Sequence, residues 1–445
     1  MVPQEAPSPN FHEPPAVYSR KPQSELPMED VDTLISARWV IPIEPATGVL
    51  DRHSVAIRQG RIVGILPSDD AARRFSAREL VDRPDHVLIP GLVNAHADIG
   101  MPVPTTPHDP PPLAPWLDPE RVRDTMELAM LRMAASGTTT FAAASLFPEI
   151  AARTAAEVHL RACVGLPVLE QQTAWASTVD EYLEKAAALH DDYSEDPLVT
   201  TAFATGASAN LSDATLQRLR RAADEIELPI FVPLHERADA VADSIRRFGS
   251  RPIERLEQLG LATPQLVGLH ATQLIATDLD LLARAGIQVI ACPRTSLRGA
   301  GAPCPVVGLD HRDIGLGLGT GDQPDLDPLA ELHLASLLGD RDSSTGPALS
   351  PLHALRMATL GGARALGLAE TTGSLLPGKW ADLCCIDLSR LRTQPVRDVA
   401  LQLVRHAGAD QVSDVWVAGR ALMLAGNFVR LDPKATLQRA ARWPL

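Results

Sequence analysis

Long apolar runs, clusters of basic residues and CxxC pairs are all missing from this sequence. No apolar run reaches the roughly 18 residues that a membrane span needs, so no membrane contact is expected. The 41 Lys and Arg and the 55 Asp and Glu give a net charge of −14, and the basic residues form no cluster in the sequence. Phosphate binding needs such a cluster, so a nucleic-acid partner is not expected either.

The cysteine count is also low, and it is odd. The five residues are Cys163, Cys292, Cys304, Cys384 and Cys385. This pattern argues against a disulfide framework and against a thiolate zinc site. A reducing cytoplasm is therefore the expected compartment, and Cys292 is interpreted as a small buried hydrophobe.

The N-terminal stretch is Pro-rich and lacks the apolar core of a signal peptide. We expect residues 1–30 to form a tail, with docking onto a partner subunit as the alternative. The remaining chain exceeds the ~250–300 residues that one core usually supports, which predicts a large domain with an appendage.

Short apolar segments alternate with amphipathic stretches between residues 89 and 369. The predicted strands are LVNAHAD, TTTFAAA, RACVGLPVL, LVTTAFATG, LPIFVPLHE, QLVGLHATQ, IQVIACP and DIGLGLGTG, with helical patterns such as DATLQRLRRAADEI between them. Repeated strand–helix units imply a parallel sheet, and about eight of them predict a closed (β/α)₈ barrel.

The two chain ends have a different pattern, of short strands separated by Gly turns. DTLISARWVIPIEP and HSVAIRQGRIVGILP are predicted as two strands near the start, and GSLLPGKWADLCCIDL and DQVSDVWVAGRALMLAGNFV give more near the end. Residues 31–88 and 370–445 are therefore predicted to build one small composite β-sandwich domain.

Barrel enzymes place their chemistry at the carboxyl ends of the strands. Six polar side chains are predicted at those ends: His96, Asp98, His235, Glu236, His270 and Asp322. They either converge on one barrel mouth or are merely solvated loop positions.

Several motifs carry a family resemblance over residues 31–443. IPGLVNAHAD resembles the PGLVNAHxH signature of amidohydrolases, and GTTTF at 137–141 follows the pattern of their second strand. RPIERLEQLGLATPQLVGLHATQL resembles the helix and sixth strand of the methylthioadenosine/S-adenosylhomocysteine deaminase group, and GSLLPGKWADL its composite domain. The triazine chlorohydrolases are similar to a lesser degree.

The resemblance implies hydrolytic deamination of an adenine-like ring by metal-bound hydroxide, because a metal lowers the pKa of its bound water towards ~7. The family holds the metal with an HxH pair on strand one, one His on each of strands five and six, and an Asp on strand eight. In that family a Glu on strand five transfers the proton and contacts the ring nitrogen of the substrate. The resemblance also suggests a purine-like ligand and a homodimer, and the low charge of MELAMLRMAASG is compatible with a buried face.

This sequence departs from that ligand pattern. His96 and His270 match, but the second strand-one position is Asp98, the strand-five position is Pro233, and the strand-eight position is Gly321, with Asp322 one residue later. A one-residue shift turns a strand side chain to the opposite face. At the end of strand seven the family often has the motif HCP, whereas this sequence has ACP, with Ala291 in place of the His. The loops at 103–115 and 205–210 also differ from the family pattern.

Two hypotheses follow. In the first, the chain is metal-free, needs no cofactor, and acts by binding or by assembling with a partner. In the second, a remodelled hydrolase holds zinc or another divalent metal through His96, Asp98, His235 and His270, or uses Glu236 with His270 for metal-independent acid–base chemistry.

Geometry favours the first hypothesis. His235 lies two residues beyond Pro233, on the same face of an extended strand but ~6.6 Å further along it. Coordination bonds tolerate about ±0.2 Å. Glu236 is then a rim carboxylate or a ligand-orienting group, and Asp322 an N-cap or loop residue or a residual ligand.

Overall fold

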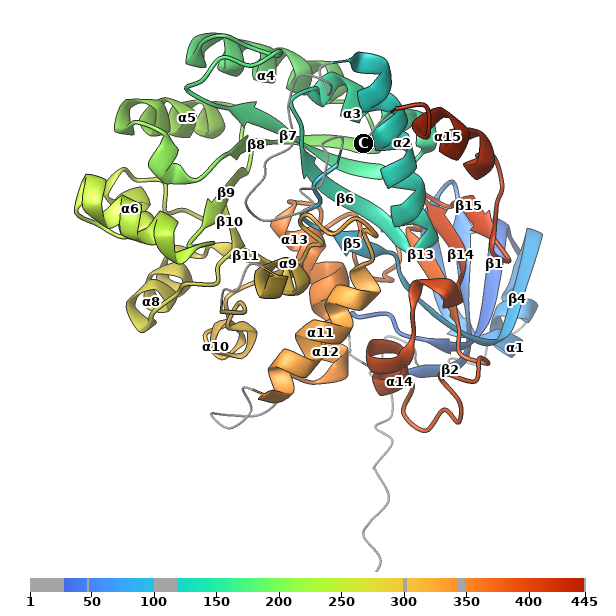
Figure 1. The fold of residues 1–445 in the computed structure, drawn as a ribbon. Coiled ribbons are helices and arrows are strands. Elements are labelled where there is room, and N and C mark those ends of the chain that lie inside the picture. The colour runs from blue at the N-terminus through green and yellow to red at the C-terminus, as the bar shows by residue number, and fades with distance from the viewer. Residues whose placement is uncertain (1–27, 46–47, 100–117, 299–301, 342–348, 444–445) are drawn as a thin grey trace, which may run out of the picture.

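The chain has a barrel and a separate β-sheet, which lie side by side (Figure 1). The computed structural model describes residues 28–45, 48–99, 118–298, 302–341 and 349–443. The N-terminal tail up to residue 27 therefore lies outside the described residues. Within the described ranges, no helix is both long and apolar enough to cross a membrane.

The barrel consists of eight parallel strands that pair in chain order. Its seam is closed by backbone hydrogen bonds: the N–H of Ala95 donates to Leu318, and Gly321 and His96 are joined in the same way, each at 2.9 Å. The strands are β5 (Leu92–Asn94), β6 (Thr138–Ala144), β7 (Arg161–Val168), β8 (Val199–Thr205), β9 (Ile230–Leu234), β10 (Leu266–His270), β11 (Gln288–Ala291) and β12 (Leu316–Leu318). The predicted (β/α)₈ barrel is confirmed.

Helices surround these strands (Figure 1). They are α2 (Pro119–Ala135), α3 (Pro148–Val158), α4 (Val179–Tyr193), α5 (Asp213–Glu225), α6 (Ala238–Phe248), α7 (Pro252–Gln258), α8 (Ala276–Ala285), α9 (Pro293–Arg298), α10 (Val306–Asp310), α11 (Pro328–Arg341), α12 (Pro351–Arg356) and α13 (Gly362–Ala365), with short turns η3 (Ser208–Asn210) and η5 (Met357–Gly361). The low-charge face of α2 is part of the chain's own core, because Met126, Met130 and Met133 are fully buried there.

Small and medium side chains fill the barrel interior, so the barrel is packed and not a pore. The interior cluster includes Val93, Ala95, Ala142, Cys163, Ala202, Phe231, Leu269, Ile290 and Cys292. Chemistry is thereby confined to the strand ends. Since Phe231 faces the interior, Pro233 two residues later lies on the same side of β9.

Both chain ends build the second sheet, as predicted. It is one eight-stranded sheet in the order β16-β15-β14-β13-β4-β1-β2-β3, in which Leu383 of β13 pairs with Pro90 of β4. Its elements are β1 (Glu29–Val40), β2 (Leu50–Arg58), β3 (Arg61–Pro67), α1 (Ser68–Arg74), β4 (Phe75–Pro90), β13 (Leu383–Asp387), α14 (Val399–His406), η6 (Ala409–Gln411), β14 (Val412–Val417), β15 (Arg420–Leu424), β16 (Asn427–Phe428) and α15 (Pro433–Ala440). The prediction of a single strand in HSVAIRQGRIVGILP was wrong, because the chain turns at Gly60 (φ +76°) and forms the hairpin β2–β3.

A buried ion pair joins the two parts. Arg161 of β7 donates to both carboxylate oxygens of Asp382, at 2.7 and 3.2 Å. The same carboxylate accepts hydrogen bonds from Thr372 and from the backbone of Ala418. Each oxygen of the buried Asp382 carboxylate thus accepts two hydrogen bonds, so the ion pair is fully satisfied and fixes the sheet relative to the barrel.

Candidate functional site

Three of the predicted side chains meet at the carboxyl ends of the barrel strands. The imidazole rings of His96 and His270 lie edge to face, with centroids 5.2 Å apart and an interplanar angle of 86°. The Nε2 atom of His270 is 3.9 Å from Oε1 of Glu236. We call these three residues, with Asp98, the mouth group.

Burial sets the protonation of the mouth group. Burial and, to a smaller extent, the neighbouring His96 lower the pKa of His270 to about 3, so the His270 imidazole is neutral near pH 7. Burial raises the pKa of Glu236, and the carboxylate of Asp98 raises it in addition. The two carboxyl groups are therefore close enough to repel each other, although Asp98 itself is exposed.

His235 does not join this group. Strand β9 ends at Leu234, and His235 has φ +50°, so the alternation of faces expected from Pro233 to His235 does not hold. Its Nε2 accepts the backbone N–H of Ile253 at 3.2 Å, and its Nδ1 lies 3.0 Å from Nη2 of Arg251. The ring is therefore directed at the start of helix α7.

A buried ion pair completes the surroundings of His235. Arg251 donates to both carboxylate oxygens of Asp278, one of them at 2.6 Å. Burial lowers the pKa of His235 to about 4, although Asp278 opposes that shift. A neutral His235 that accepts through Nε2 carries its proton on Nδ1, so no lone pair of the ring is left over.

Asp322 is also directed away from the mouth group. Its carboxylate accepts from the hydroxyl of Thr295 at 2.7 Å and pairs with Arg298, both on helix α9. It is a loop residue and not an N-cap, since Asp327 accepts the backbone N–H groups at the start of α11.

Gly321 occupies the expected strand-eight ligand position with a backbone that favours glycine. Its φ is +53°, and a Cβ atom there would lie 2.7 Å from Oγ1 of Thr295. Its carbonyl accepts the N–H of Asp98, and its N–H donates to His96, both at 2.9 Å. Gly321 thus closes the barrel seam but offers no side-chain ligand.

The comparisons with known proteins decide the family. The family model described as "Amidohydrolase family" matches residues 87–422, well over half of the chain. This chain belongs to the amidohydrolase family. The family resemblance that the motifs predicted is therefore confirmed.

Two similar proteins, both described as deaminases, agree with this family assignment. A 5-methylthioadenosine/S-adenosylhomocysteine deaminase of Teredinibacter turnerae is 36% identical over 428 residues, which cover 93% of this amidohydrolase and 97% of that protein. A protein of the same name from Saccharophagus degradans is 35% identical over 93% and 96%. The chain is thus similar to deaminases over nearly its whole length.

Solved structures give the same picture of the fold. An adenosine deaminase from Xanthomonas campestris with bound zinc superposes with a TM-score of 0.89 and 40% identity, covering 94% of this chain and 98% of that one. The atrazine chlorohydrolase TrzN from Arthrobacter aurescens, complexed with zinc, has a TM-score of 0.80 at 21% identity over 92% and 99%, which supports the fold alone.

The side chains of this amidohydrolase do not fit the metal site that the family pattern implies. His96 and His270 are in place, but Pro233 and Gly321 have no side-chain donor atom, and the Nε2 of His235 accepts the backbone N–H of Ile253. Across the described parts of the chain, no three His, Cys, Asp or Glu side chains are grouped so that they could hold a metal ion. Zinc sites need at least three protein ligands.

Of the two loops that differ from the family pattern, only the one at 205–210 belongs to the described residues. The loop at 103–115 lies outside the described residues. The loop at 205–210 is tied to helix α7, because Arg255 donates to the carbonyls of Ser208 and Leu211 at 2.7 and 2.8 Å. It therefore lies beside the same helix that holds His235.

Sequence reasoning missed the residues that hold the displaced side chains. Asp278, Thr295 and Arg298 lie in helices and Arg251 directly precedes one, and at such positions a charged or hydroxyl residue gives no signal of its partner. Cys292, in contrast, is fully buried, and burial raises the pKa of its thiol well above the usual value. A thiol in that state is not a nucleophile.

Proposed function

We propose that this amidohydrolase has lost metal-dependent deamination, and that its barrel mouth binds a small purine-like molecule without a metal. The observation that carries the proposal is the contact of His235 with Ile253 and Arg251, since it removes the one histidine that could replace the strand-five ligand. The hydrolytic reaction needs a metal to lower the pKa of water, and His96, His270 and the exposed Asp98 are not grouped so that they could hold one.

The mouth group supports a binding role. The Glu236 side chain is partly exposed and lies beside the nearly buried His270. A carboxylate can accept hydrogen bonds from ring N–H and amino groups, and a neutral imidazole can donate through one nitrogen and accept through the other. The purine-like ligand class comes from the names of the deaminase relatives.

The alternative is an active hydrolase with His96, Asp98, His235 and His270 as ligands, and the gathering of His96 and His270 favours it to that extent. His235 would have to leave the backbone N–H of Ile253, at a cost of about 1–3 kcal/mol for that buried donor left unpaired. A complete zinc site supplies more than that, on the order of 10 kcal/mol.

The experiment combines a binding assay with an ammonia assay. Adenosine, methylthioadenosine and S-adenosylhomocysteine are tested by equilibrium dialysis and for ammonia release, with zinc present and absent. We expect saturable binding of at least one of them, at least tenfold weaker in Glu236→Gln, and no ammonia above background. Glu257→Gln is the matched control, since Glu257 is exposed on α7 and pairs only with Arg284 among the described contacts.

Two results would contradict the proposal. Turnover with zinc at even ~1 s⁻¹, the low end of ordinary kcat values, would show a working remodelled site. Absence of binding to all three nucleosides would remove the binding role.

A further inference from the structure

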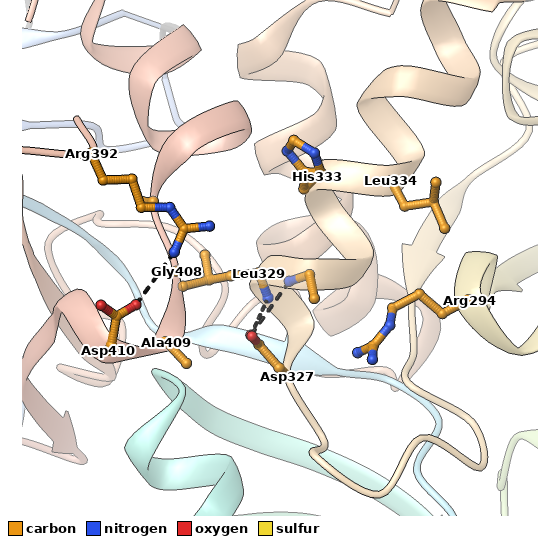
Figure 2. A pocket seen from close by; sticks show the side chains of 11 residues that line it. Arg294, Asp327, Leu329, His333, Leu334, Arg392, Gly408, Ala409 and Asp410 are labelled. Carbon is orange, nitrogen blue, oxygen red and sulfur yellow. Dashed lines mark hydrogen bonds and ion pairs between the residues drawn. The ribbon is translucent and has the colours of Figure 1, made fainter. Parts of the chain in front are cut away.

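A cleft lies at the junction of the barrel and the composite sheet domain. Its volume is about 500 Å³, and it is formed by helix α11 on one side and the turn Ala407–Asp410 with Arg392 on the other (Figure 2). None of the described residues that line it belongs to the mouth group. The volume lies in the range of small-molecule sites, about 300–1,000 Å³.

One wall of the cleft presents the guanidinium of Arg392. This group lies against Gly408, where a Cβ atom would come within 2.6 Å of Nη1 and would push the guanidinium aside. Its ion-pair partner Asp410 is 3.5 Å away, and the two side chains are 60% and 76% exposed. An exposed pair at that distance contributes little to stability, so another carboxylate can replace Asp410.

The opposite wall presents the guanidinium of Arg294 (Figure 2). Two hydrogen bonds of 2.8 Å to Asp325 hold it in a fixed orientation. The two cations thus stand on different elements, α9 and the segment before α14, with the cleft between them.

The carboxylate of Asp327, between the two walls, already has hydrogen-bond partners. Asp327 lines the cleft, but its Oδ1 accepts the N–H groups of Leu329 and Ala330, where the helix dipole offsets its charge. The remaining lining consists of His333 and of apolar residues that include Leu329, Leu334 and Ala407. The cleft therefore combines an accessible guanidinium with an apolar floor.

We propose that this cleft binds a small organic acid, with its carboxylate on Arg392 in place of Asp410 and its aromatic or aliphatic body against Leu329 and Leu334. Arginine suits this role because its planar fork can donate two parallel hydrogen bonds to one carboxylate. The proposal is independent of the function proposed for the barrel mouth.

The test measures benzoate binding to the full chain by titration calorimetry, with benzamide as the uncharged ligand of the same shape. We expect benzoate to bind saturably and benzamide at least tenfold more weakly. Arg392→Gln should weaken benzoate binding at least tenfold, and Gly408→Ala should do so too by displacing the guanidinium. Arg390→Gln is the control, since Arg390 carries the same charge two residues away and pairs with Asp387.

Three results would overturn the proposal. They are no saturable benzoate binding, equal binding of benzoate and benzamide, or an equal loss in Arg390→Gln and Arg392→Gln. The last result would mean that benzoate follows the general charge of the surface and not the cleft. A Glu236→Gln variant should bind benzoate like the wild type, which separates this site from the mouth group.

Discussion

The Nε2 atom of His235 accepts the backbone N–H of Ile253 at 3.2 Å. Because Ile253 lies in the first turn of helix α7, a donor that the helix itself cannot satisfy determines where the imidazole lies. The same contact occupies the ring nitrogen that could otherwise bind a metal. The arrangement of His235 is thus set by a helix terminus and not by the barrel strand that carries it.

Removing Arg251 should strongly destabilise the fold. In Arg251→Met the carboxylate of Asp278, which is fully buried, loses its cation, and breaking a buried pair in this way costs about 3–5 kcal/mol. Urea denaturation followed by circular dichroism gives the change in the free energy of unfolding.

Arg284→Met on the neighbouring helix is the control for that experiment. Arg284 and Glu257 form an exposed pair, 63% and 48% accessible, so its loss should cost less than about 1 kcal/mol. Equal losses in the two variants would mean that the pair of Arg251 and Asp278 is not the support that the contacts suggest.

Much of the architecture could be predicted from the sequence, because each barrel strand is a short apolar run bounded by turn residues. The positions of His96 and His270 at strand ends follow from the same pattern. The direction of His235 could not be predicted, since a positive φ at its position breaks the alternation that was assumed. The orientation of Asp322 likewise depends on Thr295 and Arg298, which are distant in the sequence.

Gly321→Ala should be more costly than an alanine at another left-handed glycine. At Gly321 the positive φ and the contact with Thr295 both act, whereas Gly249 (φ +72°) has no atom within 4 Å of an added Cβ. Gly249→Ala should therefore cost only the backbone strain, roughly 1–2 kcal/mol. Thermal denaturation should rank Gly321→Ala clearly below Gly249→Ala, and the reverse order would be inconsistent with this account of the seam.

Glu331 should make stability fall as the pH rises. Its side chain is fully buried, and burial raises its pKa from 4.5 to about 8. The folded state therefore keeps a proton that the unfolded state has lost between these values, so unfolding becomes easier by a few kcal/mol from pH 4.5 to 8. The Gln side chain cannot ionise, so Glu331→Gln should be stabilised relative to the wild type at pH 8 and much less at pH 5. A pH-independent difference in urea midpoints would contradict this.

Restoring the family ligands should rebuild a metal site only in combination. Asp98→His, Pro233→His, Gly321→Asp and Asp322→Gly together should bind zinc with His96 and His270, while each single change should not. The swap at 321 and 322 also removes Asp322 as one of the two acceptors of the Thr295 hydroxyl, which makes it easier for Thr295 to move away from an added Cβ. Activity should return weakly at most, since ligands are only part of a metal site. A combined variant that folds but stays metal-free would show that the residue correspondence is wrong.

The most direct test of the central claim is the zinc content of the unaltered chain. The protein is incubated with excess zinc, desalted, and analysed by plasma mass spectrometry alongside the combined variant. The account predicts well under one zinc ion per wild-type chain. Pro233 and Gly321 offer no side-chain ligand and His235 is bound to Ile253, so His96 and His270 are the nitrogen ligands that remain at the mouth among the described residues. One tightly held zinc ion per wild-type chain would contradict it.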